Sequence, residues 1–398
     1  MIPAAAPIQR AADAKLLVID EDGSITHRAR ADFPGLIHDG DIVVANDAAT
    51  LPASLAGVHA PTGAAIEVRL AGRDSLLPEH VTRFAALVFG AGDFRTPTEH
   101  RPHPPALHPG DVLRLGPLCA VVIRMLGHPR LIEIRFHNPV DEIWEGLARH
   151  GRPIQYAYVT EPLAAWDTWT RIAGLPAAFE PPSAGFILDW NVIQSIRSRG
   201  AGFATITHAA GISSTGDADL DRRLPFDEPY YIPPSAAGSI AASRARGGRV
   251  IAVGTTVVRA LEHAAAGNGV VRAGYGLATQ RIGPLSELRV VGAIVSGVHE
   301  RGTSHYELLR AFQDDDTLAR MDGEMQAHGY RTHEFGDSVF LPRTGLSHGV
   351  GRAFTARQES PLQRAHEDAA ADDVAIHRFP DLHLGGACRY AQHLVEGE

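Results

Sequence analysis

Short apolar runs alternate with polar stretches along this chain, and the spacing changes near residue 60 and again near residue 150. The segments KLLVID and GDIVVAN are continuous apolar runs typical of buried strands, and the second ends at Asn46 and Asp47. From about 60 to 136, turn residues separate the strand-length runs AAIEVRL, RFAALVFGAG, DVLRLG, CAVVIRML and LIEIRF. Because no helical period intervenes, this part predicts a small all-β barrel.

Helical and strand patterns alternate in the second half of the chain. In DWNVIQSIRSR apolar residues recur three apart and Gly200 follows, which predicts a helix that ends there. Next come a strand in GFATITH and a helix in AAGSIAASRAR, for which Ser235 is the expected cap. The remaining expected elements are strands at 249–254, 287–295 and 335–341, and helices at 255–265, 304–312 and 316–328.

These elements together predict an α/β fold. We expect a mostly parallel sheet with helices on both faces, interrupted by the inserted small all-β barrel domain. The expected divisions are a discontinuous α/β domain at 1–55 and 151–342, the barrel at 56–150, and a C-terminal extension at 343–398. A chain of 398 residues is long enough for two domains.

Composition and charge narrow the function classes. The apolar fraction of 44% and the charged fraction of 21% are those of an ordinary globular protein, and no apolar run approaches the length of a membrane span. The first residues lack the pattern of a secretory signal, and the two cysteines, Cys119 and Cys388, fit a reduced cytoplasm as buried or surface thiols. We therefore expect a cytoplasmic protein.

The charged and metal-ligating residues exclude further chemistry. A net charge of −9 gives no general attraction to polyanions, so nucleic-acid binding would need a local arginine patch. Lys15 is the only lysine, so imine chemistry and dependence on pyridoxal phosphate are not expected. The 21 histidines include no HExxH pair, and His299 and His305, six residues apart, would lie on different faces of a helix. We expect no metal site.

The segment GRVIAVGTTVVRALE is the most informative part of the chain. It places a helix directly after a buried strand, with Gly254 at the tight turn and Thr255 and Thr256 opening the helix. Ligands of open α/β sheets bind where the carboxyl end of a strand faces the amino end of a helix. Such a turn is weak evidence by itself, because every βα unit has one.

Eight segments in one order resemble motifs of the S-adenosylmethionine:tRNA ribosyltransferase-isomerases, the queuosine-pathway family often called QueA. The resemblance covers roughly residues 12–341, and GRVIAVGTTVVRALE matches almost letter for letter. GDIVVANDAATLPASL resembles GDLLVxNDTRVIPARL, GAAIEV resembles GGKIEV, GRPIQYAYV resembles GxxPLPPYI, and PPSAGF resembles APTAGLHF. TITHAAG resembles TLHVGxGTF, VVGAIVSGVHERGTS resembles VVDALxTNFHLPxST, and YRTHEFGDSVFL resembles YRFFSYGDAMLI.

The resemblance implies an unusual use of S-adenosylmethionine as a ribosyl donor. Ribose carbons pass to the aminomethyl group of a 7-deazaguanine in a tRNA anticodon, the product rearranges, and adenine and methionine leave. Because a sulfonium acidifies the neighbouring C–H, a positioned base can start this sequence without a metal. The implied co-substrate is S-adenosylmethionine, and the implied acceptor is tRNA.

The chain departs from the family motifs at polar positions. Losing side chains that suit an anionic RNA or proton transfer indicates a diverged member with a changed acceptor. Two other functions stay open: a paralogue that uses S-adenosylmethionine on a small molecule, and a non-catalytic protein that binds it. The departures are Ala48 and Ala49 for Thr-Arg, Ser54 for Arg, Ile187 and Phe226 for His, Ala209 and Ala210 in partial replacement of the glycines after the TLH histidine, and SGVHER for TNFHLP.

Within the matched motifs, we expect the ligand to lie around the threonine turn. The same residues also have structural interpretations: a helix cap for the threonines, an internal salt bridge for Arg259, and an Asx turn for the Asn-Asp pair. The expected S-adenosylmethionine-binding residues are Gly254, Thr255, Thr256, Arg259, Asn46, Asp47, Ser183 and Gly185.

The expected catalytic residues are His208, Glu228 and His299. The two histidines match family positions at strand ends, although a lone histidine is more often structural. Glu228 is the best remaining carboxylate for a general base or a contact to the sugar, and a surface ion pair is its alternative. We expect Glu67 and Asp337 to be structural.

Overall fold

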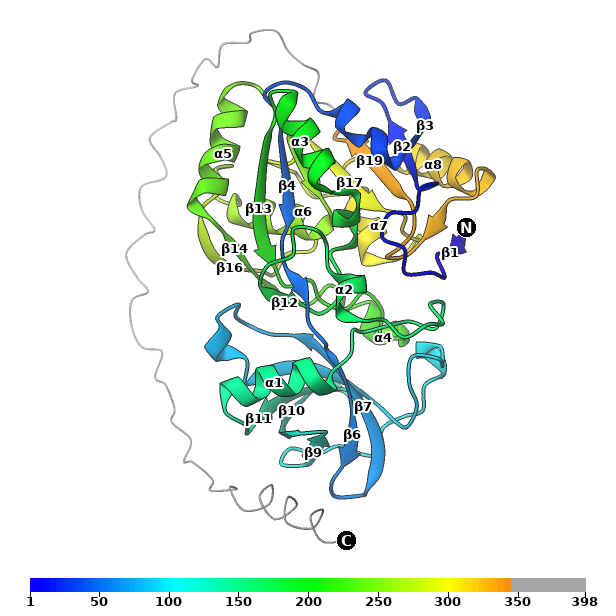
Figure 1. Cartoon of the computed structure of the whole chain (residues 1–398), viewed down its shortest axis with the longest axis vertical. Helices are drawn as coiled ribbons and strands as arrows, with labels where there is room; N and C mark the ends of the chain where they lie inside the picture. Colours follow the sequence, from blue (N-terminus) through cyan, green and yellow to red (C-terminus); the bar gives the residue numbers. More distant parts are fainter. Residues whose placement is uncertain (345–398) are drawn as a thin grey trace, which may run out of the picture. The chain divides into compact units, whose positions relative to one another are not determined.

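The computed structural model of the chain describes residues 1–344 (Figure 1). The extension expected at 343–398, with Cys388, lies outside the described residues except for its first two. Residues 1–344 contain a nine-stranded mixed sheet and a closed six-stranded barrel. The predicted α/β fold with an inserted all-β barrel is therefore confirmed.

Parallel strands occupy the centre of the sheet, where β13, β4, β15 and β17 pair side by side. Both sides continue with antiparallel pairings, and β19 and β2 add one more parallel pair. Because the four central strands run in one direction, their carboxyl ends meet at one edge. In spatial order the strands are β16 (Gly274–Ala278), β14 (Glu228–Ile232), β13 (Gly202–His208), β4 (Ile42–Asn46), β15 (Val250–Val253), β17 (Ala293–Gly297), β19 (Ser338–Pro342), β2 (Lys15–Ile19) and β3 (Ile25–Ala29).

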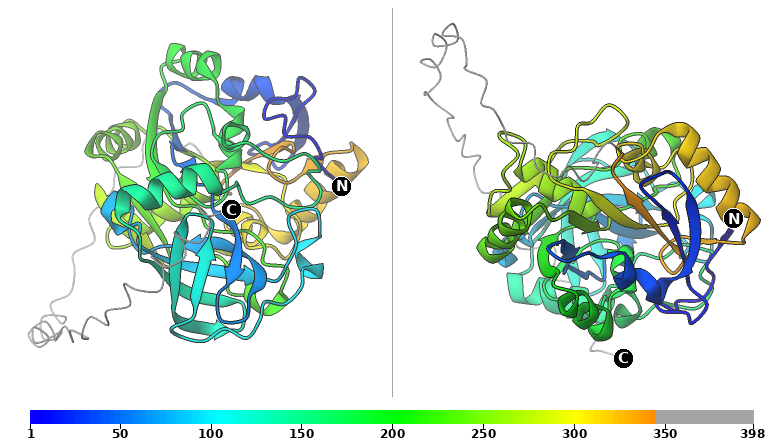
Figure 2. Two further views of the ribbon diagram at one scale, coloured as in Figure 1. Left: turned by 60° about the horizontal axis from the view of Figure 1, so that its bottom comes forward. Right: turned by 90° about the horizontal axis from the view of Figure 1, so that it is seen from above.

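Helices cover both faces of this sheet, as predicted (Figures 1 and 2). Side chains alternate between faces along β2, so Leu17 packs in one apolar cluster and Leu16 in another. The first cluster contains residues of α5 (Pro234–Ala245), α6 (Thr255–Ala264), α7 (Ser304–Leu309) and α8 (Asp315–Ala327). The second contains residues of α3 (Trp190–Ser198) and of the 3₁₀ helices η1 (Arg30–Leu36) and η4 (Ser183–Ile187).

The barrel is antiparallel throughout and has its own apolar core. Helix α1 (Val140–His150), which the sequence did not predict, packs on β10, where a Cβ on Gly146 would come within 2.4 Å of Leu118. Glu67 accepts from Arg69 and Arg101 inside the barrel, in keeping with its structural interpretation. The strands are β6 (Ser54–His59), β7 (Ala64–Gly72), β8 (Arg83–Phe89), β9 (Val112–Leu115), β10 (Leu118–His128) and β11 (Leu131–Phe136).

Shorter elements complete the described part of the chain. Two parallel strand pairs join β1 (Ile2–Pro3) to β18 (Arg331–Thr332) and β5 (Ala49–Thr50) to β12 (Pro176–Ala178). Two single-turn helices, α2 (Ala165–Thr168) and α4 (Ala218–Asp221), lie in the loops, as do η2 (Pro78–His80) and η3 (Thr98–His100). No helix within residues 1–344 has both the length and the apolar character that crossing a bilayer requires.

Two local predictions were wrong. Ser235 does not cap α5, because Pro233 is the N-cap residue and Pro234 begins the helix with its fixed φ. The strand expected at 287–295 begins only at Ala293. Before it, the backbone N–H groups of residues 289–291 donate to the carboxylate of Glu262 at 2.7–3.0 Å, which replaces strand pairing there.

Candidate functional site

Asn46 joins the ends of three elements at the carboxyl edge of the sheet. Its Oδ1 accepts from the backbone N–H groups of His208 and Ala48, each at 3.0 Å. Its Nδ2 donates to the carbonyl of His208 at 2.9 Å and faces the hydroxyl of Thr256 at 3.4 Å. Since these four contacts use the whole amide, the structural interpretation of Asn46 accounts for its position.

Its neighbour Asp47 is linked to β13, where it accepts from the hydroxyl of Thr207 at 2.6 Å. Burial raises the pKa of this carboxyl above its ordinary value, and the Thr207 hydrogen bond partly opposes the shift. Asp47 therefore sits at the predicted edge but is already engaged within the protein.

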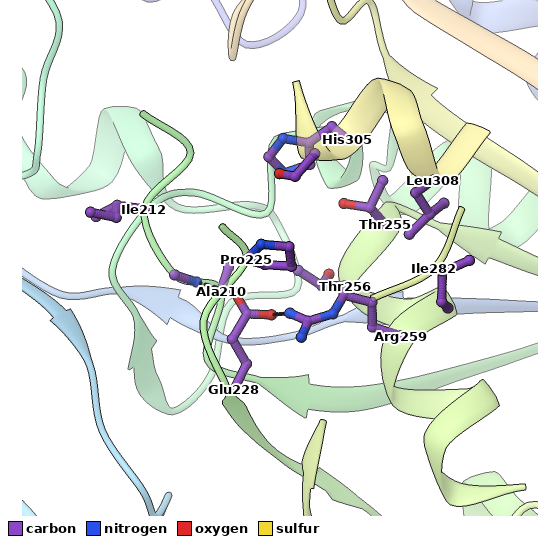
Figure 3. A pocket seen from close by; sticks show the side chains of 12 residues that line it. Ala210, Ile212, Pro225, Glu228, Thr255, Thr256, Arg259, Ile282, His305 and Leu308 are labelled. Carbon is purple, nitrogen blue, oxygen red and sulfur yellow. Dashed lines mark hydrogen bonds and ion pairs between the residues drawn. The ribbon is translucent and has the colours of Figure 1, made fainter. Parts of the chain in front are cut away.

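The turn between β15 and α6 has the geometry that the sequence predicted. Gly254 adopts φ +97°, a left-handed conformation that favours glycine, and it is the N-cap residue of α6. Thr255 and Thr256 are the first two residues of the helix, so neither is its N-cap, and the helix has no side-chain cap hydrogen bond. Both threonines instead line a small cavity of about 40 Å³ at the helix amino end (Figure 3).

We call this the small cavity, and a buried ion pair forms one wall of it. The guanidinium Nη1 of Arg259 contacts Oε2 of Glu228, and Oε1 accepts from the N–H of Gly211 at 2.6 Å (Figure 3). Arg259 also donates to the carbonyl of Ala278 at 2.9 Å. The remaining lining residues are Ala210, Ile212, Pro225, Thr255, Thr256, Ile282, Ser304, His305 and Leu308.

This ion pair bears on the structural interpretations of Arg259 and Glu228. Arg259 makes the internal salt bridge that was one of its two alternatives, while it still faces the small cavity. Glu228 is buried, so its pairing is not the surface ion pair that the sequence allowed. Burial raises the pKa of Glu228, and the charge of Arg259 opposes the shift.

His208 lies behind this pair and lines neither cavity. Its Nε2 is 3.4 Å from Oε2 of Glu228, and within residues 1–344 neither ring nitrogen has a hydrogen-bond partner. Full burial, together with the charge of Arg259, lowers the pKa of His208 well below its ordinary value. The imidazole is therefore neutral near pH 7, and the catalytic role of His208 stays a prediction.

A second cavity of about 460 Å³ adjoins the first through His305, which lines both. We call it the large cavity. His299, the third predicted catalytic residue, lines it, and Oγ of Ser296 lies 3.0 Å from His299 Nε2. Burial lowers the pKa of His299 well below its ordinary value and that of His305 to about 4, so both imidazoles are neutral near pH 7.

The helical spacing considered for His299 and His305 does not apply, because the two residues do not lie on one helix. Their rings stack with centroids 4.7 Å apart and planes 13° from parallel. His299 lies in the loop after β17 and His305 lies in the first turn of α7, so a change of chain direction separates them. The helical spacing rule assumed one continuous helix, and the loop between the two residues removes that assumption.

Ser183 and Gly185 lie in η4, beside the Gly254 turn, and line neither cavity. A Cβ placed on Gly254 would be 3.4 Å from the Cβ of Ala184, which measures how closely η4 approaches the turn. A Cβ on Gly185 would instead meet Thr170 at 3.0 Å. The predicted contacts of Ser183 and Gly185 with the ligand therefore stay predictions. Close packing of η4 against its neighbours is by itself a reason for small residues in this segment.

Sequence reasoning missed the wall of the large cavity. Tyr156 and Tyr158 stack with centroids 6.0 Å apart, and His333 stacks on Tyr158 at 4.2 Å. The hydroxyl of Tyr156 contacts Glu180, and that of Tyr158 contacts Glu334. The two tyrosines lie in GRPIQYAYV, and His333 and Glu334 lie in YRTHEFGDSVFL, so the resemblance of these motifs to the family could have pointed to them. Glu180 lies outside the quoted motifs, and no pattern in the sequence indicated it.

One group of side chains within residues 1–344 has the spacing of a possible metal site. Ligand atoms of His27, Glu324 and His328 all lie within 4.8 Å of one another. The two histidines are exposed, and the group lines neither cavity. The site geometry described above does not involve it.

The comparison with protein-family models gives one match of nearly full length. The model described as queuosine biosynthesis protein matches residues 2–341. The chain belongs to this family. The family that the motifs predicted is thereby confirmed, and the chain is a homologue of enzymes.

Individual relatives agree with the family model. The S-adenosylmethionine:tRNA ribosyltransferase-isomerase of Azoarcus sp. (strain BH72) is 33% identical over 348 residues, covering 85% of this chain and 94% of that protein. The protein of the same name from Thiobacillus denitrificans is 31% identical, covering 83% and 91%. A crystal structure of S-adenosylmethionine tRNA ribosyltransferase from Thermotoga maritima has 22% identity and a TM-score of 0.45, covering 85% of this chain and 96% of that chain.

Proposed function

We propose that this protein uses S-adenosylmethionine as a ribosyl donor and transfers the ribosyl unit to an amine, releasing adenine and methionine. The names of its relatives support this reaction class. The observation that carries it is the arrangement at the amino end of α6, where two threonines and Arg259 face one cavity. A helix amino end beside a guanidinium is suited to the carboxylate of the methionine part.

We infer that groups at the amino end of α6 bind the methionine part of S-adenosylmethionine. The first-turn N–H groups of α6 and the hydroxyls of Thr255 and Thr256 attract the carboxylate. Arg259 can exchange Glu228 for that carboxylate, because its carbonyl contacts hold the guanidinium in place. Glu228 then becomes available for the ammonium of the methionine part or for a sugar hydroxyl.

The first proton transfer is assigned to the stacked pair His299 and His305. Both imidazoles are neutral near pH 7, so each has an electron pair that can accept the proton acidified by the sulfonium. The burial that lowers their pKa also limits contact with water, which protects reactive intermediates. His208 supports Glu228 from behind.

Product analysis tests this function. Full-length protein is incubated with S-adenosylmethionine, with and without tRNA that carries the aminomethyl deazaguanine, and adenine and methionine are quantified. Adenine formed with an amine acceptor supports the proposal. Stabilisation by S-adenosylmethionine without any turnover would instead indicate a non-catalytic binding protein, and no binding at millimolar concentration would exclude the donor.

A small-molecule acceptor is the second candidate, and one observation favours it. Of the described residues that line the large cavity, three are glutamates and none is arginine or lysine. The replacements Ala49 and Ser54, where the family motif has arginine, also remove positive charge. Adenine release with a free amine and no RNA would select this candidate.

A further inference from the structure

The large cavity has an acidic lining that the donor-binding groups do not explain. Glu334 is half-buried in it, and Glu99 and Glu300 are exposed lining residues. Histidines are the lining groups that could carry positive charge, and burial keeps His299 and His305 neutral near pH 7. A concave surface with carboxylates of one sign attracts an organic cation and repels an anion.

The inner wall of this cavity is a stack of rings that ends in carboxyl groups. The ring of Tyr158 lies between those of Tyr156 and His333, with interplanar angles of 10° and 17°. Each tyrosine hydroxyl meets one glutamate, Tyr156 with Glu180 and Tyr158 with Glu334. The wall therefore combines flat apolar surface with negative charge.

The hydrogen bonds of Tyr156 indicate that Glu180 can hold a proton. The Tyr156 hydroxyl has one hydrogen but faces two acceptors, Glu180 Oε1 and the carbonyl of Ser214 at 3.1 Å. A protonated Glu180 would donate to Tyr156 and leave the tyrosine hydrogen for Ser214. Oε2 of Glu180 accepts from the N–H of Ser213 at 3.0 Å. Burial, and then the charge of Glu334, raises the pKa of Glu180 to about 7.

We propose that the large cavity is the acceptor pocket, that it binds a protonated primary amine through Glu334, and that a protonated Glu180 releases its proton to the solvent when the amine enters. This assignment rests on the proposed function and names the substrate class of the same site. Before transfer, the ammonium gives one proton to a carboxylate of the Glu180–Glu334 pair. The products of that step are a neutral amine with a free electron pair and one carboxyl group.

Two residues of this wall differ from the motifs that the chain resembles. Aligned with GxxPLPPYI and YRFFSYGDAMLI, Tyr156 stands at a proline and Glu334 at a serine. A carboxylate introduced at a cavity wall needs a counter-charge or a ligand, and within residues 1–344 Glu334 has no ion pair. The bound amine supplies that charge.

Calorimetry on the full chain tests the pocket with benzylammonium and with benzyl alcohol, its neutral analogue of similar shape. Wild-type protein should bind benzylammonium at least about tenfold more tightly than benzyl alcohol, and Glu334→Gln should remove the difference. Glu287→Gln, which changes an exposed glutamate, is the matched control and should bind as wild type. Equal binding of the two probes by wild-type protein would overturn the pocket.

Proton counting tests Glu180 separately. Titrations in two buffers with different ionisation enthalpies give the protons released on binding. At pH 7 wild-type protein should release about half a proton with benzylammonium, because Glu180 is then about half protonated. Glu180→Gln should release none while still binding the probe. Release that persists in Glu180→Gln would overturn the role of that residue.

Two further arms separate the alternatives. If an RNA hairpin carrying the aminomethyl deazaguanine displaces benzylammonium, the acceptor amine of this pocket is carried by RNA. If the hairpin does not displace the probe, the acceptor is a free small-molecule amine. S-adenosylmethionine is titrated in parallel. If S-adenosylmethionine binds but the cationic probe is not preferred, the amine pocket is overturned and the proposed function stands. If the cationic probe is preferred but S-adenosylmethionine does not bind, the proposed function and the acceptor role are overturned, and only the amine-binding site remains.

Discussion

The small and the large cavity share His305 but balance negative charge in opposite ways. In the small cavity Glu228 meets Arg259, so the protein neutralises its own carboxylate. At the large cavity Glu334 in the lining and Glu180 behind Tyr156 meet tyrosine hydroxyls, which stabilise a carboxylate without cancelling its charge. The difference indicates that Glu228 stabilises the fold through Arg259, which it can release to a ligand. The charge of Glu180 and Glu334 stays available for a cationic ligand.

The two cavities also differ in what builds them. The small cavity is lined by α6, by Glu228 of β14 and by α7, with loop residues at 210–212, 225 and 282 completing it. The large cavity is lined by the loop segments 156–158, 213–214, 298–303 and 332–334. Loops change more easily than sheet edges, so an altered acceptor is expected at the large cavity, with the donor site retained.

The largest effect is expected when a substitution removes the negative charge from the ion pair of the small cavity. Glu228→Gln should lower the free energy of unfolding by about 3 to 5 kcal/mol, because it leaves the buried Arg259 without a counter-charge. Urea unfolding measures this. The double variant Glu228→Gln with Arg259→Gln should recover part of the loss. A single variant as stable as wild type would show that the pair is not a buried ion pair.

The next effect concerns the large cavity and its dependence on pH. The pKa of Glu180 rises from an ordinary 4.5 to about 7, so between these values the folded state keeps a proton that the unfolded state has lost. This contribution makes the protein less stable as pH rises through that window, by at most about 3 kcal/mol.

Melting curves from pH 5 to pH 8 compare wild type with Glu180→Gln, which cannot ionise. The variant should lose less stability than wild type over the window, with Glu287→Gln as the control for an exposed carboxyl. Parallel curves for wild type and Glu180→Gln would contradict the raised pKa.

A smaller effect is expected at the amino end of α6. Thr256→Val keeps the shape of the side chain but removes the hydroxyl, and we expect about tenfold weaker binding of S-adenosylmethionine with little change in the unfolding midpoint. Calorimetry measures the affinity. Thr26→Val, in β3 and outside both cavities, is the control. Wild-type affinity in Thr256→Val would remove that hydroxyl from the donor site.

The smallest effect tests whether the cavities are coupled. His305 lines both, so His305→Gln should weaken the binding of S-adenosylmethionine and of benzylammonium, each by about threefold. Exposed His80→Gln is the control and should change neither affinity. An effect on one ligand only would show that the cavities act independently.

The regular elements of the site were predictable because local patterns determine them. The run VIAV followed by Gly254 and two threonines specifies a buried strand, a tight turn and a helix without reference to the rest of the chain. The motif order also identified the family. By contrast, the pairing of Arg259 with Glu228 joins residues that are 31 positions apart, and the sequence left an internal salt bridge of Arg259 as one of two alternatives without naming its partner.

The large cavity was beyond sequence reasoning for a related reason. Tyr158 and Glu334 are 176 positions apart, and Tyr156 and Glu180 meet across separate loops. The His299–His305 stack depends on where a loop ends and α7 begins. Loop conformation follows from packing against the finished barrel and sheet, which no local pattern encodes.

By itself the sequence determined the α/β body, the inserted barrel, the threonine turn and the family, because periodicity, turn residues and motif order are local properties. Tertiary structure alone decided that Glu228 is neutralised by Arg259, that Glu334 lines the large cavity and that Glu180 lies behind it against Tyr156. The physical reason is that charge and pKa depend on burial and on neighbours brought together by folding.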